Sequence, residues 1–427
     1  MIRKIWTLLF ILTVSTVPLL SQGYGNTDIV SFEKNADNLK KIVEMRLDVL
    51  MEKDGKIFIV ADWEDLNNLQ LNGLDFQIET QNFFPFAQQN VSVQGGINGD
   101  FHSYPELERD LLALESSYPD LARVSVIGTS LENRNIYALK ISDNVASNEG
   151  EAEVLFIGCH HAREWISVEV PFLLGKYLLE NYNSDIEVQN LVDQSEIWIV
   201  PLLNPDGLEY SIYNYRYWRK NRRDNGGGSY GVDPNRNYGF QWGLNDEGSS
   251  PDPNSETYRG TQPFSEPETQ VIRDLYAQHP FQFMISYHSY SQVLLYPWGY
   301  TYEPSDQAAL LDELAKNMVE RMEPVNGRLY DYGQAAGSLY TTNGGAVDWS
   351  FGTYGIPSYT LELPPMYPNQ GQFFNSEEDI IPIFNENLEA CLYMIDWAIQ
   401  NAPQYRDRES YLRRDIRNNI IIPRIKK

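Results

Sequence analysis

The sequence predicts an α/β fold in which a mixed sheet carries helices on both faces. Apolar runs of strand length alternate along the chain with segments that have the pattern of helices. The strand-like runs lie at 153–158, 196–202, 281–287 and 357–363, and the helix-like segments lie at 165–182, 306–322 and 385–400. Such alternation is typical of a sheet covered by helices. Residues 100–402 number roughly 300, enough to bury one large core as a single domain.

Histidines stand at the ends of two of these strand-like runs, although the chain has only five histidines. His161 comes shortly after the first run, and Glu164 lies one helical turn later, so both side chains can face the same side. His288 follows directly after the run 281–287. In α/β sheets, ligands bind at the carboxyl ends of the strands. Two imidazoles and a carboxylate suit a catalytic zinc, which uses three protein ligands and keeps one position open.

The other histidines are weaker candidates for a third ligand. His102 lies in a segment with the composition of a linker, and His279 stands directly before Pro280. An HxxE pair by itself recurs by chance, and a histidine beside a strand end is usually an ordinary surface or core residue. The more specific HExxH pattern of metalloproteases does not occur in the sequence. The prediction of zinc therefore depends on further motifs downstream of His161.

Seven short blocks occur in a fixed order between about Phe101 and about Ala402. They are His161–Ser167, Asn204–Gly207, Trp218–Lys220, Gly231–Asn237, His288–Ser291, Gly344–Trp349 and Thr360–Leu363. Together they resemble the zinc carboxypeptidases, the family of pancreatic carboxypeptidases A and B and of bacterial carboxypeptidase T. Residues 256–269 look more like the bacterial branch. The resemblance implies an eight-stranded type of mixed sheet, preceded by a small α+β prosegment.

The resemblance also implies a mechanism. His161, Glu164 and His288 would hold one Zn²⁺, which lowers the pKa of its bound water to about 7. Glu362 would be the general base, and Arg219 would stabilise the oxyanion. Alternation in residues 358–363 places Glu362 on one strand face with Thr360, away from the apolar side chains. Without the other blocks, Glu362 would be interpreted more simply as a solvated glutamate. Arg219 would be interpreted as part of a basic surface patch.

Recognition of the substrate is implied by the same resemblance. Asn235, Arg236 and Tyr340 would hold a free C-terminal carboxylate, because a planar guanidinium can bind a carboxylate through two parallel hydrogen bonds. That contact would make the protein an exopeptidase. Arg163 would bind the penultimate residues of the peptide. Asp233 would orient the first zinc-binding histidine by accepting its other ring N–H.

The expected pocket for the terminal side chain is largely apolar. The position that carries an aspartate in B-type enzymes corresponds to Val347, so we expect no buried anion there for Lys or Arg. Ala335 is smaller than the branched residue of an A-type pocket and leaves extra room. We expect apolar or aromatic terminal residues, and broad specificity of the carboxypeptidase T kind stays open. The lining residues are Leu295, Gly299, Leu339, Val347 and Thr360.

The N-terminus predicts export. Residues 1–23 combine Arg3 and Lys4, an apolar run to Leu20 and a small-x-small cleavage site, as in a secretory signal peptide. An uncleaved anchor is the alternative. No later run approaches the roughly 20 apolar residues of a membrane span, so we expect no stable membrane insertion. We predict secretion to the periplasm or the exterior.

Residues 24–99 are expected to form a prosegment and a linker, and the resemblance implies that the enzyme is made as an inhibited zymogen. Residues 45–50 and 56–60 have the pattern of strands around a turn, and residues 84–99 have the composition of a linker. Residues 57–108 contain no Lys or Arg. A trypsin-like activator therefore has no site in the linker, and we predict cleavage by another type of protease or by the enzyme itself.

The formal charge of −26 argues against nucleic acid as a partner, because binding to phosphates requires a basic face. The tail at 403–427 is the exception, since it is basic; it could contact an anionic surface or form a solvated helix. An acidic loop, which holds Asp246, Glu247, Asp252 and Glu256, is a candidate for Ca²⁺, with a solvated loop as the alternative. The two cysteines, Cys159 and Cys391, leave their pairing open.

We expect a monomer that acts on peptides or proteins with a free C-terminus. Two other functions compete with this prediction. An amidase of the same fold would not be expected to keep the complete set Asn235, Arg236 and Tyr340. A non-catalytic peptide-binding protein would be expected to lack Glu362 or a zinc ligand, and the sequence has all of them.

Overall fold

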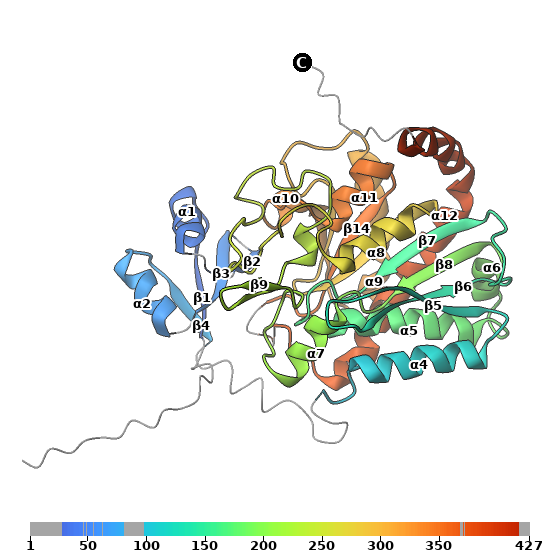
Figure 1. Cartoon of the computed structure of the whole chain (residues 1–427), viewed down its shortest axis with the longest axis horizontal. Helices are drawn as coiled ribbons and strands as arrows, with labels where there is room; N and C mark the ends of the chain where they lie inside the picture. The colour runs from blue at the N-terminus through green and yellow to red at the C-terminus, as the bar shows by residue number, and fades with distance from the viewer. Residues whose placement is uncertain are drawn as a thin grey trace, which may run out of the picture.

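The computed structural model describes residues 28–80 and 98–417, apart from 46, 48, 54, 62, 368, 369 and 371. The expected signal peptide at 1–23, most of the expected linker and the last ten residues of the basic tail lie outside the described residues. The described chain forms a small N-terminal unit and a larger unit beside it (Figure 1).

A mixed sheet of eight strands organises the larger unit, as the sequence predicts. The strand order is β13-β12-β14-β11-β7-β8-β6-β5. The four central strands, β14, β11, β7 and β8, run parallel to one another. On one side β12 pairs antiparallel with β14 and parallel with β13, and on the other side β6 pairs antiparallel with both β8 and β5. The strands are β5 (Ala122–Thr129), β6 (Asn135–Ile141), β7 (Ala152–Ile157), β8 (Ser195–Val200), β11 (Phe281–Ser289), β12 (Val293–Tyr296), β13 (Asp331–Gln334) and β14 (Ser358–Leu363).

Helices cover both faces of this sheet (Figure 1). One face packs against α4 (Tyr104–Ser117), α5 (Ile166–Asn181), α6 (Ile186–Val192), α9 (Ala308–Asn326) and α12 (Ile380–Arg417). The other face packs against α8 (Pro267–Tyr276) and α11 (Ala346–Tyr354). The remaining elements are α7 (Pro205–Tyr213), α10 (Ala335–Ser338), the short strands β9 (Asp224–Gly226) and β10 (Ser229–Tyr230), and the 3-10 turns η1 (Pro234–Arg236) and η3 (Glu377–Asp379).

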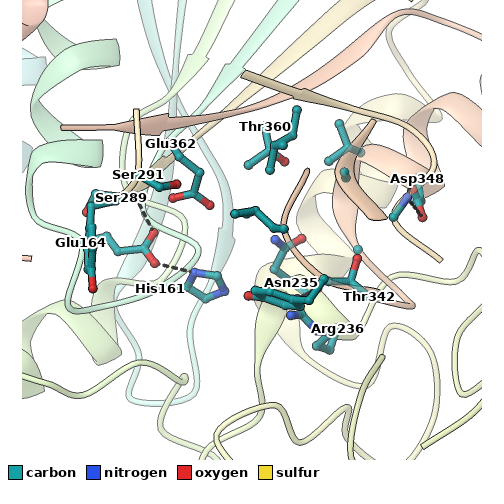
Figure 2. A pocket seen from close by; sticks show the side chains of 18 of the residues that line it. His161, Glu164, Asn235, Arg236, Ser289, Ser291, Thr342, Asp348, Thr360 and Glu362 are labelled. Atoms are coloured by element: carbon teal, nitrogen blue, oxygen red, sulfur yellow. Dashed lines mark hydrogen bonds and ion pairs between the residues drawn. The ribbon is translucent and has the colours of Figure 1, made fainter. Parts of the chain in front are cut away.

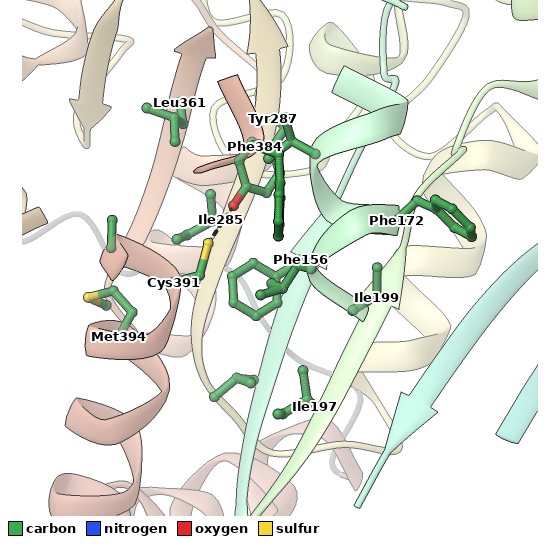
Figure 3. Close-up of a cluster of buried hydrophobic side chains, with 14 of the residues drawn as sticks. Phe156, Phe172, Ile197, Ile199, Ile285, Tyr287, Leu361, Phe384, Cys391 and Met394 are labelled. Atoms are coloured by element: carbon green, nitrogen blue, oxygen red, sulfur yellow. Dashed lines mark hydrogen bonds between the residues drawn. The ribbon is translucent and has the colours of Figure 1, made fainter. Parts of the chain in front are cut away.

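Two hydrophobic cores result, one on each face of the sheet. Successive residues of a strand point to opposite faces, so in β7 Phe156 joins the core beneath α5 and α12 while Ile157 joins the core beneath α8 and α11. This explains why the central strands are continuous apolar runs rather than alternating ones. Figure 3 shows the first core, where the Tyr287 hydroxyl lies 2.9 Å from Cys391 Sγ. Cys391 and Cys159 are both buried and free, so they do not pair.

The last helix is longer than the sequence predicts. We expected residues 385–400, and α12 spans Ile380–Arg417, so the helix continues past residue 403, where the basic tail was expected to begin. The prediction relied on apolar periodicity, which ends before the helix does. The segment that follows is rich in charged residues and has no glycine, and such a composition is compatible with a helix. None of the described helices has the length and apolar character needed to cross a membrane.

The N-terminal unit is a small α+β structure with the strand order β2-β3-β1-β4. Its core contains Val30, Phe32, Ile42, Ile57 and Ile59. The strand expected at 45–50 is wrong at its start, because the chain is helical through residue 45 and the strand begins at residue 49. The elements are β1 (Asp28–Glu33), α1 (Ala36–Met45), β2 (Val49–Lys53), β3 (Lys56–Ala61), α2 (Trp63–Leu71) and β4 (Gln77–Thr80).

Candidate active site

The site lies at the carboxyl edge of the parallel strands. His161 comes after β7 and a short loop, His288 is the next-to-last residue of β11, and Glu362 is the next-to-last residue of β14. The register of β11 and β14 pairs His288 directly with Glu362. Because parallel strands end at the same edge, residues that are far apart in the sequence meet there.

Three metal-ligating side chains converge at this edge, and each of them is buried. His161 Nδ1 lies 2.8 Å from Glu164 Oε1, and His288 Nδ1 lies 3.0 Å from Glu164 Oε2. The two histidine Nδ1 atoms are 3.1 Å apart. One ligand atom from each of the three residues can be chosen so that all lie within 4.8 Å of one another. Two imidazoles and one carboxylate are a donor set that suits zinc, so the side chains present fit the metal that the sequence predicts.

The ring nitrogens on the far side of both histidines have partners of their own. His161 Nε2 lies 3.2 Å from Asp233 Oδ1, and His288 Nε2 lies 3.1 Å from the Ser286 hydroxyl. Such contacts fix the orientation and the tautomer of a metal-binding imidazole. The sequence predicts the contact of Asp233, but Ser286 was missed, although it stands two residues before His288 on the same strand face.

Asp233 also binds Arg219, whose Nε and Nη2 donate to Asp233 Oδ2 at 3.1 and 2.9 Å. Burial opposes ionisation of Asp233, but the charges of Arg219 and His161 hold the pKa of this carboxyl well below its usual range. Burial likewise opposes ionisation of Glu164, but His161 and His288 hold the pKa of that carboxyl well below its usual range. Both acids are therefore anions at neutral pH.

Close contacts and side-chain hydrogen bonds fix the conformation of the loop after β7. At Gly158, an added Cβ would lie 2.2 Å from Ser167 O and 2.5 Å from Pro201 O, so only glycine fits. The Asn204 side chain donates to the carbonyls of His160 and Lys220. This asparagine therefore joins the loop of His161 to the loop of Arg219. The Asn204–Gly207 block was noted in the sequence for its resemblance, and the structure shows its role in positioning.

Glu362 faces the converging ligands, as Figure 2 shows. Burial raises the pKa of Glu362 well above the usual range of a glutamate, and the nearby charge of Glu164 adds to this effect. The positive charges of Arg219, Arg163 and Arg236 act in the opposite direction. A carboxyl group with a raised pKa beside a metal site can take up and return a proton.

A single pocket gathers most of the residues that the sequence predicts for the site. His288 and Asp233 are not among its lining residues, and they support it from behind. The pocket also contains Ala335, Thr342 and Asp348. The predicted residues that line it are His161, Arg163, Glu164, Arg219, Asn235, Arg236, Leu295, Gly299, Leu339, Tyr340, Val347, Thr360 and Glu362.

Asn235 and Arg236 are held rigidly inside this pocket. Asn235 Oδ1 accepts the backbone N–H of Ala346 at 2.9 Å, which places the amide at the start of α11. Arg236 is 2 % exposed, and its Nη1 donates to Asn235 O at 2.9 Å. Its Nε has no hydrogen-bond partner among the described residues. A buried guanidinium with an unused donor favours an anionic ligand.

Asp348 is an acid that the sequence-based prediction did not include, since that prediction concerned only the neighbouring position, Val347. Val347 does line the pocket, but the next residue contributes a carboxyl group to the same lining. The feature of the sequence that could have indicated it is an acidic residue directly after Val347, in the first turn of α11. The lining therefore combines the predicted apolar residues with one carboxyl group.

Two further histidines, His102 and His279, have acidic partners away from this pocket. His102 Nδ1 lies 2.7 Å from Glu169 Oε2 and its Nε2 lies 3.2 Å from Asp110 Oδ2. Burial lowers the pKa of His102, but these two acids outweigh it and raise the pKa to about 9. His279 lies 2.7 Å from Glu153 Oε2. His279 also belongs, with Glu153 and Glu196, to a second group of side chains that offers one ligand atom each, all within 4.8 Å of one another.

The acidic loop does not support the calcium hypothesis. Asp246 forms an ion pair with Arg259 at 2.8 Å. Lys220 enters the loop and donates to the backbone oxygens of Pro253 and Ser255. Among the described residues, the four acids of this loop form no group that could hold a metal ion. Arg259 and Lys220 supply the positive charge that contacts this loop.

A mixed sheet with two imidazoles and a carboxylate converging at its carboxyl edge is the arrangement of a metal-dependent hydrolase. Comparisons with known proteins agree. A model of the zinc carboxypeptidase family matches residues 107–390. Carboxypeptidase B of Astacus astacus is 35% identical over 296 residues, which cover 68% of this chain and 94% of that protein. A zinc carboxypeptidase of Saccharothrix mutabilis subsp. capreolus is 34% identical over 351 residues, which cover 78% of this chain and 80% of that protein.

A solved structure also matches. The carboxypeptidase A from Helicoverpa armigera superposes with a TM-score of 0.75 at 25% identity, covering 90% of this chain and 98% of the other. The chain belongs to the zinc carboxypeptidase family. It is a metallocarboxypeptidase, a hydrolase that acts on peptides, and the family implies zinc as its metal.

Proposed function

We propose that the protein is a secreted zinc exopeptidase that removes single residues from the C-terminus of peptides and is made as a zymogen. The observation that carries this proposal is the position of Arg236 and Asn235 in the same pocket as His161, Glu164 and Glu362. A cation that binds the terminal carboxylate, placed beside the hydrolytic groups, limits cleavage to the last peptide bond.

In this proposal, each residue has a defined task. His161, Glu164 and His288 hold zinc, which when bound supplies a Lewis acid and lowers the pKa of water. Glu362 accepts the proton of the attacking water and passes it to the nitrogen of the leaving amine. Arg219 donates hydrogen bonds to the carbonyl oxygen as negative charge develops on it, which favours the transition state over the bound substrate.

The other residues of the pocket position the peptide. Asn235, Arg236 and Tyr340 bind the terminal carboxylate. Arg163, whose guanidinium lies 4.3 Å from the ring centroid of Phe373, contacts the penultimate part of the substrate. Apolar terminal side chains fit against Leu295, Leu339, Val347 and Thr360, which line the pocket.

A panel of short peptides tests this function. The zinc-loaded, processed enzyme is given peptides that end in Phe, Leu, Lys or Glu, each with a free or an amidated C-terminus. We expect release of the last residue only from the free acids, because an amide lacks the charge that Arg236 binds. Equal cleavage of the amidated peptides would contradict the carboxylate contact. Absence of cleavage from every peptide would favour a binding protein.

The N-terminal unit supports the proposal of a zymogen. Val49 of β2 lines the same pocket as His161 and Glu362. Beside it, Ile29 and Phe58 pack against Tyr217, Tyr290 and Phe373 of the larger unit, forming a small hydrophobic cluster. A segment that covers the pocket in this way excludes peptide substrates, and its removal would expose the site.

Replacing Phe58 with Asp should activate the unprocessed chain. Phe58 is 8 % exposed, and a charge buried in this cluster without a partner destabilises the contact. We expect hydrolysis of a Phe-terminated peptide by the full-length chain to rise by about tenfold or more, since 1.4 kcal/mol is a factor of ten. The matched control is Leu71→Asp in the same unit, because Leu71 is 84% exposed. If wild-type unprocessed chain already equals the processed enzyme, the N-terminal unit does not inhibit.

The basic and apolar pattern of residues 1–23 supports secretion. For the linker, we still predict activation by a protease that does not cut after Lys or Arg. We propose a monomer, with no nucleic-acid partner in view of the charge of −26. We also keep an amidase of the same fold as the competing function, which the amidated peptides would reveal.

A further inference from the structure

His160 is a buried histidine that the mechanism above does not use. It directly precedes His161 in the sequence, but its side chain does not line the pocket. It is 0 % exposed, and its ring stacks on that of His288, with the ring centroids 5.3 Å apart and an angle of 18° between the planes. A buried imidazole needs hydrogen-bond partners. The partners of His160 therefore indicate its role.

Hydrogen bonds connect His160 to the far side of His288. The Ser286 hydroxyl lies 3.1 Å from His288 Nε2 and 3.1 Å from His160 Nδ1, so it bridges the two rings. On its other side, His160 Nε2 lies 2.9 Å from the Tyr238 hydroxyl. All three side chains are fully buried. We call Ser286, His160 and Tyr238 the relay.

The position of one proton sets the direction of the hydrogen bonds in the relay. His288 Nδ1 faces the other metal-ligating residues, since it lies 3.0 Å from Glu164 Oε2. A nitrogen that binds a metal must be unprotonated, so the neutral His288 ring must carry its proton on Nε2. Ser286 Oγ then accepts this N–H, and the Ser286 O–H donates to His160 Nδ1. The proton of His160 is therefore on Nε2, which donates to the Tyr238 oxygen.

Asn235 also lies near His288 Nε2, but it cannot replace Ser286. Its Nδ2 is 3.5 Å from that nitrogen. The orientation of the amide is fixed, because its Oδ1 accepts the backbone N–H of Ala346 at 2.9 Å. Asn235 therefore presents a donor to His288, and a donor cannot accept the Nε2 proton. Among the described contacts of this nitrogen, the Ser286 hydroxyl is the acceptor.

The acceptor that His160 offers matters only when His288 binds a metal. In the metal-free chain, His288 Nδ1 can keep a proton and donate it to Glu164, and Ser286 then donates to His288 Nε2. In that arrangement the Ser286 hydrogen already has an acceptor. In the metal-bound arrangement it needs another one, and His160 Nδ1 supplies it. A buried O–H without an acceptor is unfavourable, so loss of this acceptor would penalise the metal-bound form.

Tyr238 holds His160 in the orientation that this role requires. The two ring centroids are 5.8 Å apart. Tyr238 in turn packs against Trp349 of α11 and against Phe264, with ring centroids 5.4 and 5.9 Å away. The hydrogen-bond partners described for His160 are two hydroxyl groups and include no acid. Its buried ring is therefore neutral and can accept the hydrogen of Ser286.

We propose that His160 is a positioning residue for zinc, which acts through Ser286 to keep the proton of His288 on Nε2 and so leaves Nδ1 free to bind the metal. This inference rests on the proposed set of zinc ligands and adds to it a residue outside the pocket. Groups that orient a metal-binding histidine in this way typically change metal affinity by about 10- to 100-fold.

The zinc affinity of the full chain tests this proposal without an activity assay. The metal-free chain is titrated with Zn²⁺ in competition with a chromophoric chelator, and its thermal unfolding is recorded in parallel. We expect His160→Leu to bind zinc about 10- to 100-fold more weakly than wild type, because the Ser286 hydroxyl loses its acceptor. His160→Asn should stay within about threefold of wild type, since its Oδ1 offers an acceptor near the position of Nδ1.

Three further variants distinguish positioning from stability. His160→Gln is polar but reaches past the position of Nδ1, so it should bind zinc as weakly as His160→Leu. Its comparison with His160→Asn serves if His160→Leu does not fold. The double variant of His160→Leu and Ser286→Ala should lose no more affinity than Ser286→Ala alone, because both residues act through one relay. Tyr276→Phe removes a buried hydrogen bond to Ser350 outside the relay, so it should lower Tm and leave zinc affinity unchanged.

The outcomes separate this inference from the proposed function. A wild-type chain that binds no zinc would overturn the proposed ligands and this inference with them. Zinc binding by wild type with the same affinity in His160→Leu would overturn only the role of His160. Equal affinities of His160→Asn and His160→Gln, or losses that add up in the double variant, would also overturn that role.

Discussion

Replacing Glu362 with Gln should lower kcat for a Phe-terminated peptide by about 10²- to 10⁴-fold, the usual contribution of a general acid-base group. Gln has nearly the same shape as Glu but cannot accept the proton of the attacking water. Zinc should stay bound, because Glu362 is not one of the three converging ligands, His161, Glu164 and His288. The measurement combines kcat with the number of zinc ions per chain, determined by elemental analysis.

Two companion variants make this result specific. Glu320→Gln changes an exposed glutamate on α9 that contacts Lys316, and it should leave both kcat and zinc content unchanged. His288→Ala removes a ligand and should lose zinc and activity together. If Glu362→Gln retained near-normal turnover, another group would have to be the base and the mechanism proposed here would be wrong.

Replacing Arg236 with Gln should lower kcat/KM for free-acid peptides by about 10²- to 10³-fold, because loss of a buried, charged hydrogen-bond donor costs roughly 2–5 kcal/mol. Amidated peptides do not use this charge, so their slow hydrolysis, if measurable, should change far less. The preference for free acid over amide should therefore collapse. The measurement is the ratio of kcat/KM for one peptide in its two forms, compared between wild type and variant.

Arg236→Lys is the matched variant that keeps the positive charge and changes only the geometry of the hydrogen-bond donors. Lys keeps the charge but lacks the planar fork of donors, so its ratio should lie between those of wild type and Arg236→Gln. Arg273→Ala, an exposed arginine that pairs with Asp274 on the surface, should behave like wild type. A ratio that stays high in Arg236→Gln would mean that other groups bind the terminal carboxylate, and the assignment of Arg236 would fail.

The local pattern of the sequence is sufficient for part of this site. The continuous apolar runs at 153–158 and 281–287 predict buried strands, and a residue at the end of a buried strand reaches the ligand-binding edge of the sheet. His161 and Glu164 are three positions apart, and a local turn before α5, in which the Glu164 N–H donates to His161 O, brings them together. For these residues, chemistry and short-range geometry give the same prediction as the structure.

Other contacts depend on segments that meet only in the folded chain. Glu362 stands beside His288 because β14 pairs with β11 in one register, and nothing in residues 358–363 specifies that neighbour. Arg219 meets Asp233 across a loop, and the resemblance to a family, rather than the local pattern, indicated their roles. The N-terminal unit contacts the pocket through Val49, which no local pattern predicts.

By itself, the sequence of this protein was sufficient to predict the class of fold and the family, because strand-forming runs and the seven blocks are properties of short segments, and it named His161, Glu164 and His288 as candidate metal ligands. The tertiary structure decided which side chains share a pocket. Asp348 shows the difference, since the sequence has an acid at a helix start, whereas only the contact of α11 with Gly299 and Tyr300 buries it at the end of the pocket. Burial and long-range contacts set the pKa and the accessibility of such a group, and those arise only when distant segments pack together.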